Sequence, residues 1–373
     1  MQVQPVDRDL YISFIKEHPL GNFLQYPSWA EVKTEWNHDL LGWFQDGKLV
    51  GVALVLYRKT PAVKKYLAYI PRGPIIDWES GNLREWFQPL FNYLQTKNVF
   101  TIKMDPPVVR SIWRMDTIRA ALKEIREQGG KKRLRDVAAD EVNTHALVVE
   151  QQLNELGWKK QPSEGVGSSV GQPGYVFRLP LENRTLDDIF AGFHKNWRRN
   201  VRKSERNNIE VTIGDESDLR DFYDLLLITA ERDNYRVRGY EYFERMYKAL
   251  KKEDPDRIRL YLAKFEGKLL ASTLAIYSNR HVWYLYGASS NDLREKMPNH
   301  AIQWRMIQDA YNMGAHTYDF RGISSTLDEE DPLFGLLRFK LGFGGEAHEL
   351  IGEWDYPLQP MLHWAFDMYM KRR

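Results

Sequence analysis

The sequence predicts an α/β protein built from two tandem domains of the same fold, and an internal near-repeat is the main reason. Residues 46–57 read DGKLVGVALVLY and residues 266–277 read EGKLLASTLAIY, at a constant offset of 220 (266 − 46). Each segment is followed by an aromatic strand pattern, an amphipathic helix pattern and another short strand. We therefore expect one α/β unit to occur twice, with a cleft between the copies, because ligand sites often lie between domains.

The first copy reads as a helix, a hairpin, a strand, a second helix and a closing strand. The second hairpin strand has blurred alternation, as in a sheet that is covered on both faces. The second helix has apolar residues at helical spacing, and Asp105-Pro106-Pro107 stops the closing strand. In chain order we expect a helix at 7–17, strands at 39–45, 48–57 and 66–70, a helix at 83–95 and a strand at 100–104.

A linking region separates the two copies. Residues 110–140 are rich in Lys and Arg and are interrupted by Gly129-Gly130, so we expect a helix, a loop and a turn. A helix is expected at 144–156. Residues 165–174 are rich in Gly and Ser, which is typical of a linker or mobile loop.

The second copy repeats the order of the first and adds helices. We expect a strand at 175–179, helices at 186–206 and 217–232, strands at 259–264, 269–277 and 281–286, a helix at 299–313, a strand at 317–320, an acidic loop at 322–335 and a closing helix at 361–373. The predicted domains are therefore 1–170 plus 352–373, and 171–351.

Length and composition limit the class of protein. At 373 residues, two domains are the default expectation. The absence of cysteine excludes disulfides, thiolate nucleophiles and Cys-ligated metal sites. The start does not resemble a signal peptide, and no apolar run approaches the ~20 residues that span a bilayer, so we expect a cytoplasmic protein. The net charge of +2 means that any polyanion must be bound by local patches.

Several enzyme signatures are missing from the sequence. There is no GxxxxGK[ST] loop, no strand-linked GxGxxG and no GxSxG elbow. The nine histidines show no HxxxH or HxxEH spacing for a metal ion. These absences argue against an NTPase, a dinucleotide oxidoreductase, a serine hydrolase and a zinc enzyme.

Six cations gather on one side of the predicted helix 186–206. Phe190, Phe193, Trp197 and Val201 form an apolar stripe at helical spacing. The opposite side carries Lys195, Arg198, Arg199, Arg202, Lys203 and Arg206. Such a face beside aromatic residues suits a phosphate backbone, although an ordinary solvated helix face would have the same pattern.

Two other segments could contribute to a site. Residues 231–243 combine arginines with aromatic residues, and arginine offers paired donors to phosphate or carboxylate unless it pairs with nearby acids. In the glycine-rich segment 334–345, Lys340 stands among Leu and Phe. A cation there could stabilise an oxyanion, whereas a lysine whose stem lies along apolar surface would have the same spacing.

Asp105 and Asp319 both end predicted strands at corresponding places in the two copies. Strand ends are where α/β proteins place functional side chains. An Asp before Pro is also a common turn former, so a structural role stays open for Asp105.

Taken together, several motifs resemble the Fem family of tRNA-dependent peptidyltransferases. They are QYPSWAEVK at 25–33, KMDPPV at 103–108, FHKNWRRNVRKSERNNIEV at 193–211, the ERD and RxxxYF segments within 231–243, WYLYGASS at 283–290, YDFRGI at 318–323 and RFKLGFGGE at 338–346. The resemblance implies two tandem acetyltransferase-like (GNAT) domains. It also implies transfer of an amino acid from aminoacyl-tRNA to the stem peptide of a peptidoglycan precursor. No sustained heptad is visible, so the chain resembles the FemX-like members that lack a helical arm.

The resemblance also implies roles for individual residues. Lys33 and Arg238, with Tyr242 beside them, correspond to residues that hold the diphosphate of the precursor. Phe339 and Lys340 correspond to the pair next to the transfer chemistry, and Asp105 to the Asp of the DPP step. The Tyr of the WYLYG run is Tyr284 or Tyr286.

The expected partners are aminoacyl-tRNA and a UDP-linked or lipid-linked muramyl peptide. A lipid-linked acceptor would bring the protein to the inner face of the membrane. We expect the protein to be a monomer. Aminolysis of an ester needs no metal or organic cofactor, and we expect none. One alternative is a related transferase that acts on an antibiotic or another small amine. Others are an acyl-CoA N-acyltransferase, whose [QR]xxGx[GA] loop is not evident, and a non-catalytic module that binds tRNA or the precursor.

Overall fold

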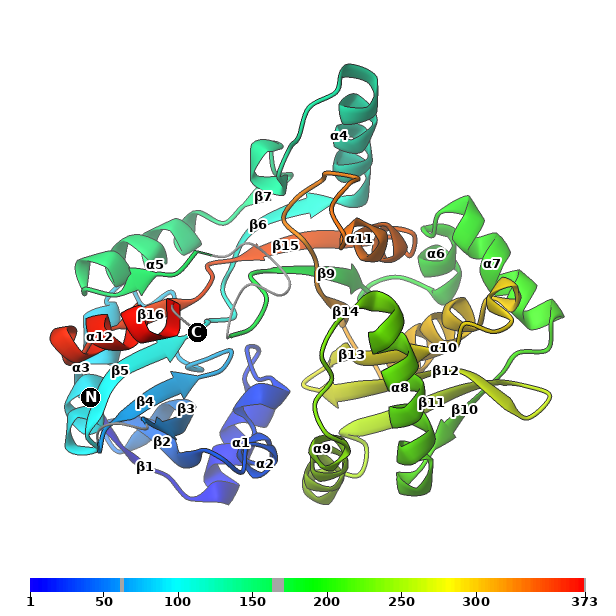
Figure 1. The fold of residues 1–373 in the computed structure, drawn as a ribbon. Helices are drawn as coiled ribbons and strands as arrows, with labels where there is room; N and C mark the ends of the chain where they lie inside the picture. Colours follow the sequence, from blue (N-terminus) through cyan, green and yellow to red (C-terminus); the bar gives the residue numbers. More distant parts are fainter. Residues whose placement is uncertain (61–63, 163–170, 372–373) are drawn as a thin grey trace. The chain divides into compact units, whose positions relative to one another are not determined.

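The computed structural model describes residues 1–60, 64–162 and 171–371, and it shows a mixed α/β protein (Figure 1). The chain divides into two compact units. Unit 1 contains Met1–Ile112, Ala139–Tyr175 and His348–Arg373, and unit 2 contains Trp113–Ala138 and Val176–Ala347. The domain boundaries expected at 170 and 351 stay a prediction. Most of the Gly/Ser-rich stretch expected at 165–174 lies outside the described residues.

Unit 1 is built on a sheet with the strand order β1-β2-β3-β4-β5-β16-β8. Neighbouring strands are antiparallel except for the parallel pair β4 and β5. The strands are β1 (Gln2–Pro5), β2 (Asn37–Gln45), β3 (Lys48–Lys59), β4 (Tyr66–Ile70), β5 (Val99–Met104), β16 (Trp354–Tyr356) and β8 (Lys159–Lys160). The predicted strands of the first copy are confirmed, whereas β1, β16 and β8 were not predicted because they are too short to show periodicity.

The helices of unit 1 enclose an aromatic core. They are α1 (Arg8–Glu17), α2 (Pro27–Val32), α3 (Leu83–Thr96), α5 (Thr144–Glu155) and α12 (Pro360–Lys371). Trp86 and Phe87 of α3 pack with Trp158 and Trp354 in one buried cluster. Many of the aromatic residues therefore fill this core.

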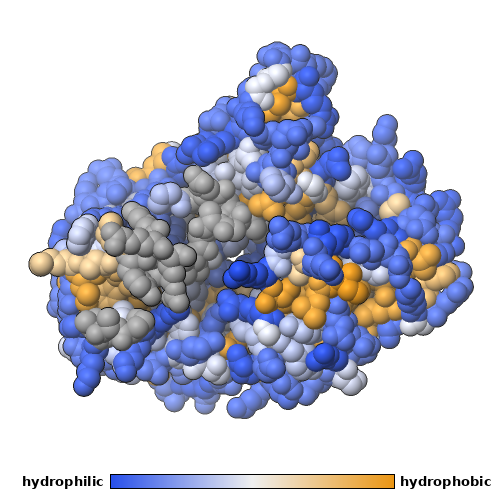
Figure 2. Space-filling view, in the orientation of Figure 1, coloured by the Kyte–Doolittle hydropathy of each residue, from blue (hydrophilic) through white to orange (hydrophobic). Residues whose placement is uncertain are grey.

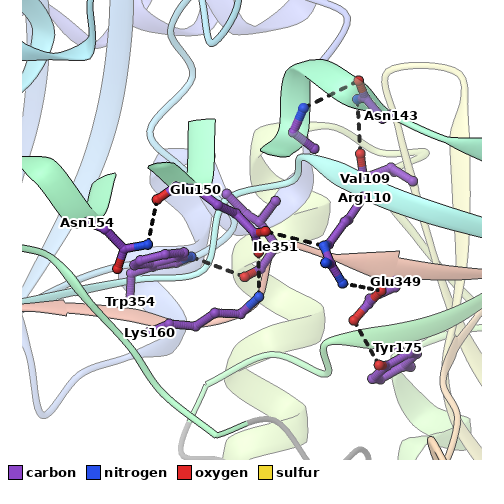
Figure 3. A network of polar contacts seen from close by, with 11 residues as sticks. Val109, Arg110, Asn143, Glu150, Asn154, Lys160, Tyr175, Glu349, Ile351 and Trp354 are labelled. Atoms are coloured by element: carbon purple, nitrogen blue, oxygen red, sulfur yellow. Dashed lines mark hydrogen bonds and ion pairs between the residues drawn. The ribbon is translucent and has the colours of Figure 1, made fainter. Parts of the chain in front are cut away.

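A polar network in unit 1 is centred on Arg110 of β6 (Val109–Arg114) (Figure 3). Arg110 Nε lies 3.2 Å from Glu150 Oε2 of α5, and Arg110 Nη1 lies 3.2 Å from Glu349 Oε2 of β15 (Glu346–Leu350). The Tyr175 hydroxyl donates a hydrogen bond of 2.8 Å to Glu349 Oε1. One arginine therefore fastens the segments at which the chain enters and leaves unit 1. The short strand β7 (Glu141–Val142) pairs with β6 here.

The sheet of unit 2 contains the order β10-β11-β12-β13-β14-β9. Its strands are β9 (Tyr175–Pro180), β10 (Glu210–Gly214), β11 (Ile258–Phe265), β12 (Lys268–Ser278), β13 (His281–Ser289) and β14 (Thr317–Gly322). Strands β13 and β14 are parallel, and the other pairs are antiparallel. The strand patterns of the second copy are thus confirmed, and β10 was not predicted.

The helices of unit 2 are α4 (Met115–Gln128), α6 (Leu186–Ala191), α7 (Lys195–Arg206), α8 (Leu219–Asp233), α9 (Tyr240–Glu253), α10 (Pro298–Asn312) and α11 (Phe334–Leu341). The prediction of one helix over 186–206 was wrong. The His194 side chain accepts the backbone N–H of Asn196 and begins a new helix, so the chain turns between α6 and α7. The described helices include none that is long and apolar enough to cross a bilayer.

The internal repeat is confirmed at the level of single residue pairs. Turn residues Asp46 and Gly47 have φ of 50° and 75°, and Glu266 and Gly267 have 49° and 77°. The first hairpin has a register shift between Trp43 and Phe44, and the second has one between Ala263 and Lys264, again offset by 220 (263 − 43). A bulge sets local twist and bend, so the two hairpins share their shape as well as their sequence.

Candidate active site

Lys340 is a buried lysine on α11 of unit 2, only 3% exposed. Its Nζ donates a hydrogen bond of 2.6 Å to the backbone carbonyl of Gly322. Burial lowers the pKa of Lys340 to about 7, although the charge of Asp319 opposes this shift. The side chain does not reach bulk solvent, so the alternative of an ordinary snorkelling lysine does not describe it. A lysine of this kind can hold or release a proton near neutral pH.

Asp319 organises the strand end that faces Lys340. Its Oδ2 accepts hydrogen bonds from Arg178 Nε at 3.1 Å and from His281 Nε2 at 3.2 Å. Its Oδ1 accepts the backbone N–H of Arg321 at 2.6 Å, and Arg321 has a left-handed φ of 66°. Asp319 therefore fixes the turn that leads to the Gly322 carbonyl.

The charge of Asp319 is maintained by its neighbours. Burial alone would raise the pKa of Asp319, but the hydrogen bond from His281 and the charge of Arg178 hold this pKa well below its usual range. Burial in turn lowers the pKa of His281. Neither Arg178 nor His281 belongs to a short motif, which is why the sequence did not reveal them. Asp319 was predicted to end a strand, whereas it lies inside β14, which continues to Gly322.

Phe339, next to Lys340, belongs to an aromatic wall. Its ring centroid lies 5.5 Å from that of His300, 5.2 Å from Phe343 and 6.4 Å from Trp197 of α7. A Cβ on Gly342 would come within 2.0 Å of the Trp197 indole, so glycine is required there. Burial lowers the pKa of His300 to about 4, which makes it neutral and part of this wall.

The basic segment 113–138, which belongs to unit 2, holds the loop that connects β14 to α11. Arg126 Nε lies 2.6 Å from Glu329 Oε1, and Lys131 Nζ lies 2.5 Å from Asp328 Oδ2. The Leu134 N–H donates a hydrogen bond of 2.8 Å to the Ser325 carbonyl. These contacts constrain the loop whose two ends carry Gly322 and Lys340.

The cationic face of α7 separates into two kinds of residue. Arg198 Nη1 donates to the carbonyls of Ala191 and Phe193, so it closes the turn from α6. Arg202 lies 5.4 Å from the ring of Phe190 and is exposed. Among the described residues, no carboxylate forms an ion pair with the remaining cations of the face, Lys195, Arg199, Lys203 and Arg206. These charges are available to a polyanion.

Asp105 in unit 1 is only 1% exposed, and both of its carboxylate oxygens accept hydrogen bonds. The Tyr69 hydroxyl donates to Oδ2 at 2.7 Å and the Gln172 N–H donates to the same oxygen at 2.9 Å. The Arg72 N–H donates to Oδ1. Three donors fit a positioning role at least as well as a base, and the catalytic role of Asp105 stays a prediction.

Comparison with known proteins gives the family. The FemAB family model matches residues 7–268 and 261–371, which is nearly the whole chain. The chain belongs to the FemAB family. It is 28% identical to lipid II:glycine glycyltransferase of Staphylococcus epidermidis, covering 97% of this chain and 94% of that protein. It is 26% identical to the enzyme of the same name from Staphylococcus aureus, covering 100% of this chain and 96% of that protein.

Solved structures agree with the FemAB assignment. A crystal structure of FemX superposes with a TM-score of 0.82 at 26% identity, over 98% of this chain and 99% of that chain. A tandem GNAT protein from the clavulanic acid pathway superposes with a TM-score of 0.52 at 10% identity, over 96% and 99% of the two chains. The second match concerns the fold alone. The predicted tandem GNAT-like architecture is confirmed.

The diphosphate residues implied by the FemAB resemblance lie in different units. Lys33 is half-buried at the end of α2 in unit 1, with Nζ 5.0 Å from the Trp29 ring. Arg238 is exposed in unit 2, and its guanidinium lies 4.8 Å from the ring of Tyr242. The stacking holds Arg238 in one orientation. Their joint binding of one diphosphate stays a prediction.

Tyr284 and Tyr286 of β13 have different surroundings. The ring of Tyr286 lies 5.0 Å from that of Phe243 on α9. The hydroxyl of Tyr284 covers Gly287, where an added Cβ would come within 1.9 Å of it. Burial raises the pKa of Tyr284 to about 12, so its hydroxyl stays a donor at neutral pH. Both residues stay candidates for substrate contact.

A cluster of possible metal ligands in unit 1 has a different explanation. One ligand atom each from Asp355, His363 and Asp367 lies within 4.8 Å of the others. The ammonium of Lys103 lies 2.8 Å from Asp355 Oδ1 and also contacts Glu353. Lysine therefore supplies the positive charge that a metal ion would otherwise bring.

Proposed function

We propose that this protein transfers an amino acid from aminoacyl-tRNA to an amine on the stem peptide of a peptidoglycan precursor. The support is twofold. Relatives that align over nearly their full length are lipid II:glycine glycyltransferases. The chain also carries a buried lysine, Lys340, whose pKa is lowered to about 7. It lies beside an aromatic wall, at the position that the Fem resemblance connects with transfer.

The reaction is the aminolysis of an ester. The acceptor amine attacks the ester carbonyl, a C–N bond forms, and the C–O bond to the tRNA ribose breaks. The amine loses a proton and the ribose oxygen gains one, so no external acid or base is consumed. The tetrahedral intermediate carries an oxyanion, which needs a fixed positive partner.

The proposed mechanism depends on the buried position of Lys340. In its protonated form it supplies that positive partner, and its pKa of about 7 leaves a substantial protonated fraction at neutral pH. The Gly322 carbonyl holds the ammonium in one place, and Asp319 fixes the turn that carries this carbonyl. Phe339 shapes the apolar wall beside it, where water is excluded and the charge acts at low dielectric.

The remaining residues are assigned to binding. The free cations of α7 suit the phosphates of tRNA, because release of counterions drives such binding. Lys33 and Arg238 suit the two phosphates of the precursor, with Tyr242 orienting Arg238.

One experiment tests the proposal directly. The protein is incubated with charged tRNA pools and, separately, with UDP-linked precursor, lipid-linked precursor and aminoglycoside-type amines, and each acceptor is examined by mass spectrometry. We expect the mass of one aminoacyl residue on a muramyl peptide, and loss of this product when the tRNA is deacylated. Modification of the small amines alone, or a product formed from acyl-CoA without tRNA, would contradict the proposal.

A further inference from the structure

The last residues of β14 form a bulge that carries two opposite charges, Asp319 and Arg321. The register of β14 against β9 shifts between Asp319 and Gly322. Within this shift Arg321 has a left-handed φ of 66°, a conformation that costs free energy in arginine. The Arg321 N–H donates a hydrogen bond of 2.6 Å to Asp319 Oδ1, which holds the strained conformation. Strain that the surrounding structure enforces is typical of functional sites.

The bulge faces the buried Lys340 of α11. The backbone carbonyl of Gly322, directly after Arg321, accepts a hydrogen bond of 2.6 Å from Lys340 Nζ. Charged residues usually lie at the surface, where they contribute to the blue colouring over most of the face drawn in Figure 2. Lys340 and Asp319 differ, since they are 3% and 2% exposed, and Arg321 is half-buried. Water therefore screens their interactions poorly, and single neighbouring charges have strong effects.

Asp319 and Arg321 act on Lys340 in opposite directions. Burial contributes most to the lowered pKa of Lys340, while the charge of Asp319 raises this pKa and the charge of Arg321 lowers it. Arg178 of β9 and His281 of β13 also face the cluster, and both donate to Asp319. Burial lowers the pKa of His281, which favours its neutral form. These donors keep Asp319 ionised, so its charge acts on Lys340.

We propose that Asp319 and Arg321 are positioning residues for the transfer, and that together they determine how much of Lys340 is protonated. Asp319 favours the ammonium of Lys340, and Arg321 favours the neutral amine. Neither residue has to touch the reacting atoms, because both act through Lys340. A bulge with only a structural role would leave the protonation of Lys340 unchanged when either charge is removed. The inference deepens the proposed function and rests on it, since protonated Lys340 is the positive partner of the oxyanion there.

Nuclear magnetic resonance of the full-length protein tests the effect on Lys340 without any transfer. Lysine is labelled with ¹³C at Cε, and the signal of Lys340 is identified by its absence from Lys340→Met. In the wild type this signal should titrate at the pKa of about 7. Asp319→Asn should lower the midpoint by about one unit, the effect of losing one close opposite charge, and Arg321→Gln should raise it. Midpoints that stay in place, or that move in the same direction, would overturn the inference.

Transfer rates show whether the protonation of Lys340 matters to the reaction. Single-turnover rates with saturating acceptor are measured from about pH 5.5 to about pH 8, and each variant is divided by the wild type at the same pH. The division cancels the titration of the acceptor amine, which is common to both. The ratio for Asp319→Asn should fall roughly five- to tenfold across this range, because a lowered midpoint leaves less ammonium at the upper end. The ratio for Arg321→Gln should rise instead, and ratios that are constant with pH in both variants would overturn the inference.

Variants that keep the charge are the matched controls. Asp319→Glu and Arg321→Lys should give ratios that do not change with pH, because the charge beside Lys340 is retained. Asp292→Asn and Arg220→Gln remove exposed members of ion pairs in unit 2, and they should match the wild type throughout. Arg321 is half-buried, so Arg321→Gln by itself keeps both tests available if Asp319→Asn fails to fold.

The two measurements separate this inference from the proposed function. Midpoints that move in opposite directions, in a protein that transfers to no acceptor, would contradict the proposed function. They would leave the control of Lys340 protonation by Asp319 and Arg321 in force. Transfer by the wild type with unmoved midpoints would support the proposed function and overturn the inference.

Discussion

Unit 1 contains a half-buried lysine, Lys103, and unit 2 contains a buried one, Lys340, and the two lysines have opposite surroundings. Lys103 in unit 1 contacts the carboxylates of Glu353 and Asp355. Lys340 in unit 2 donates to one backbone carbonyl, and Asp319, the acid whose charge acts on it, is already engaged by Arg178 and His281. Burial by itself would lower the pKa of Lys103, but Asp355 and Glu353 raise it. Burial lowers the pKa of Lys340 to about 7.

This difference separates a structural lysine from a reactive one. The ammonium of Lys103 is compensated within the fold, so it remains charged and joins β5 to β16. The ammonium of Lys340 is only partly compensated, so it is available to a charge that develops during a reaction. Perturbed pKa values of this kind are typical of functional sites. The same amino acid thus has two roles, decided by the carboxylates around it.

The largest expected effect is on stability, in unit 1. Lys103→Met should lower the free energy of unfolding by about 3–5 kcal/mol, because removing one partner leaves buried carboxylates without their cation. Denaturant titration measures this change. The matched control is Lys97→Met, which removes an exposed pair with Asp39 at 3.2 Å and should cost less than about 1 kcal/mol. Equal losses of stability in the two variants would contradict the structural role proposed for Lys103.

The next effect is on rate, in unit 2. Lys340→Met keeps most of the side-chain volume and should lower the single-turnover transfer rate by roughly 10²–10³, the cost of losing one oxyanion donor. Acceptor affinity should change little. Arg338→Met, which removes an exposed cation from the same helix, is the control and should retain the rate. A Lys340→Met enzyme as fast as the wild type would refute the proposed role of this cation.

The third prediction concerns the contribution of each unit to binding of the precursor. Lys33→Met in unit 1 and Arg238→Met in unit 2 should each weaken binding of a nucleotide-linked precursor by about 1.5–3 kcal/mol, as expected for hydrogen bonds to charged groups. Calorimetry measures these affinities. Affinity for tRNA should stay at the wild-type value in both variants. If only one of the two variants lost precursor affinity, the shared diphosphate site would be wrong.

The smallest change, counted per pH unit, is expected in the pH dependence of stability. The unfolded lysine releases its proton near ~10.4, whereas folded Lys340 does so at about 7. Between these values the unfolded state binds more protons, so the free energy of unfolding should rise with pH by at most about 1.4 kcal/mol per unit. Unfolding measured at several pH values in this window should show a flatter slope for Lys340→Met. Identical slopes would contradict the low pKa of Lys340.

Local patterns were sufficient for much of the fold. The two hairpins were predicted because turn residues and strand patterns act over a few positions. The break between α6 and α7 was missed, since the cap by His194 competes with a continuous helical pattern. Helix α9 was not predicted, although its buried residues Tyr242, Phe243, Met246, Tyr247 and Leu250 recur at the spacing of one helix face.

The sequence by itself determined the repeat, the family motifs and the residue types of the site, because these depend on neighbouring positions along the chain. Only the tertiary structure decided that Lys340 is buried and that Lys103 is neutralised. It also decided that Asp319 is engaged by residues 141 and 38 positions away and that α12 leaves Trp364 exposed. Desolvation and Coulomb energies depend on distances in space, and those distances are set by packing between segments that are remote in sequence.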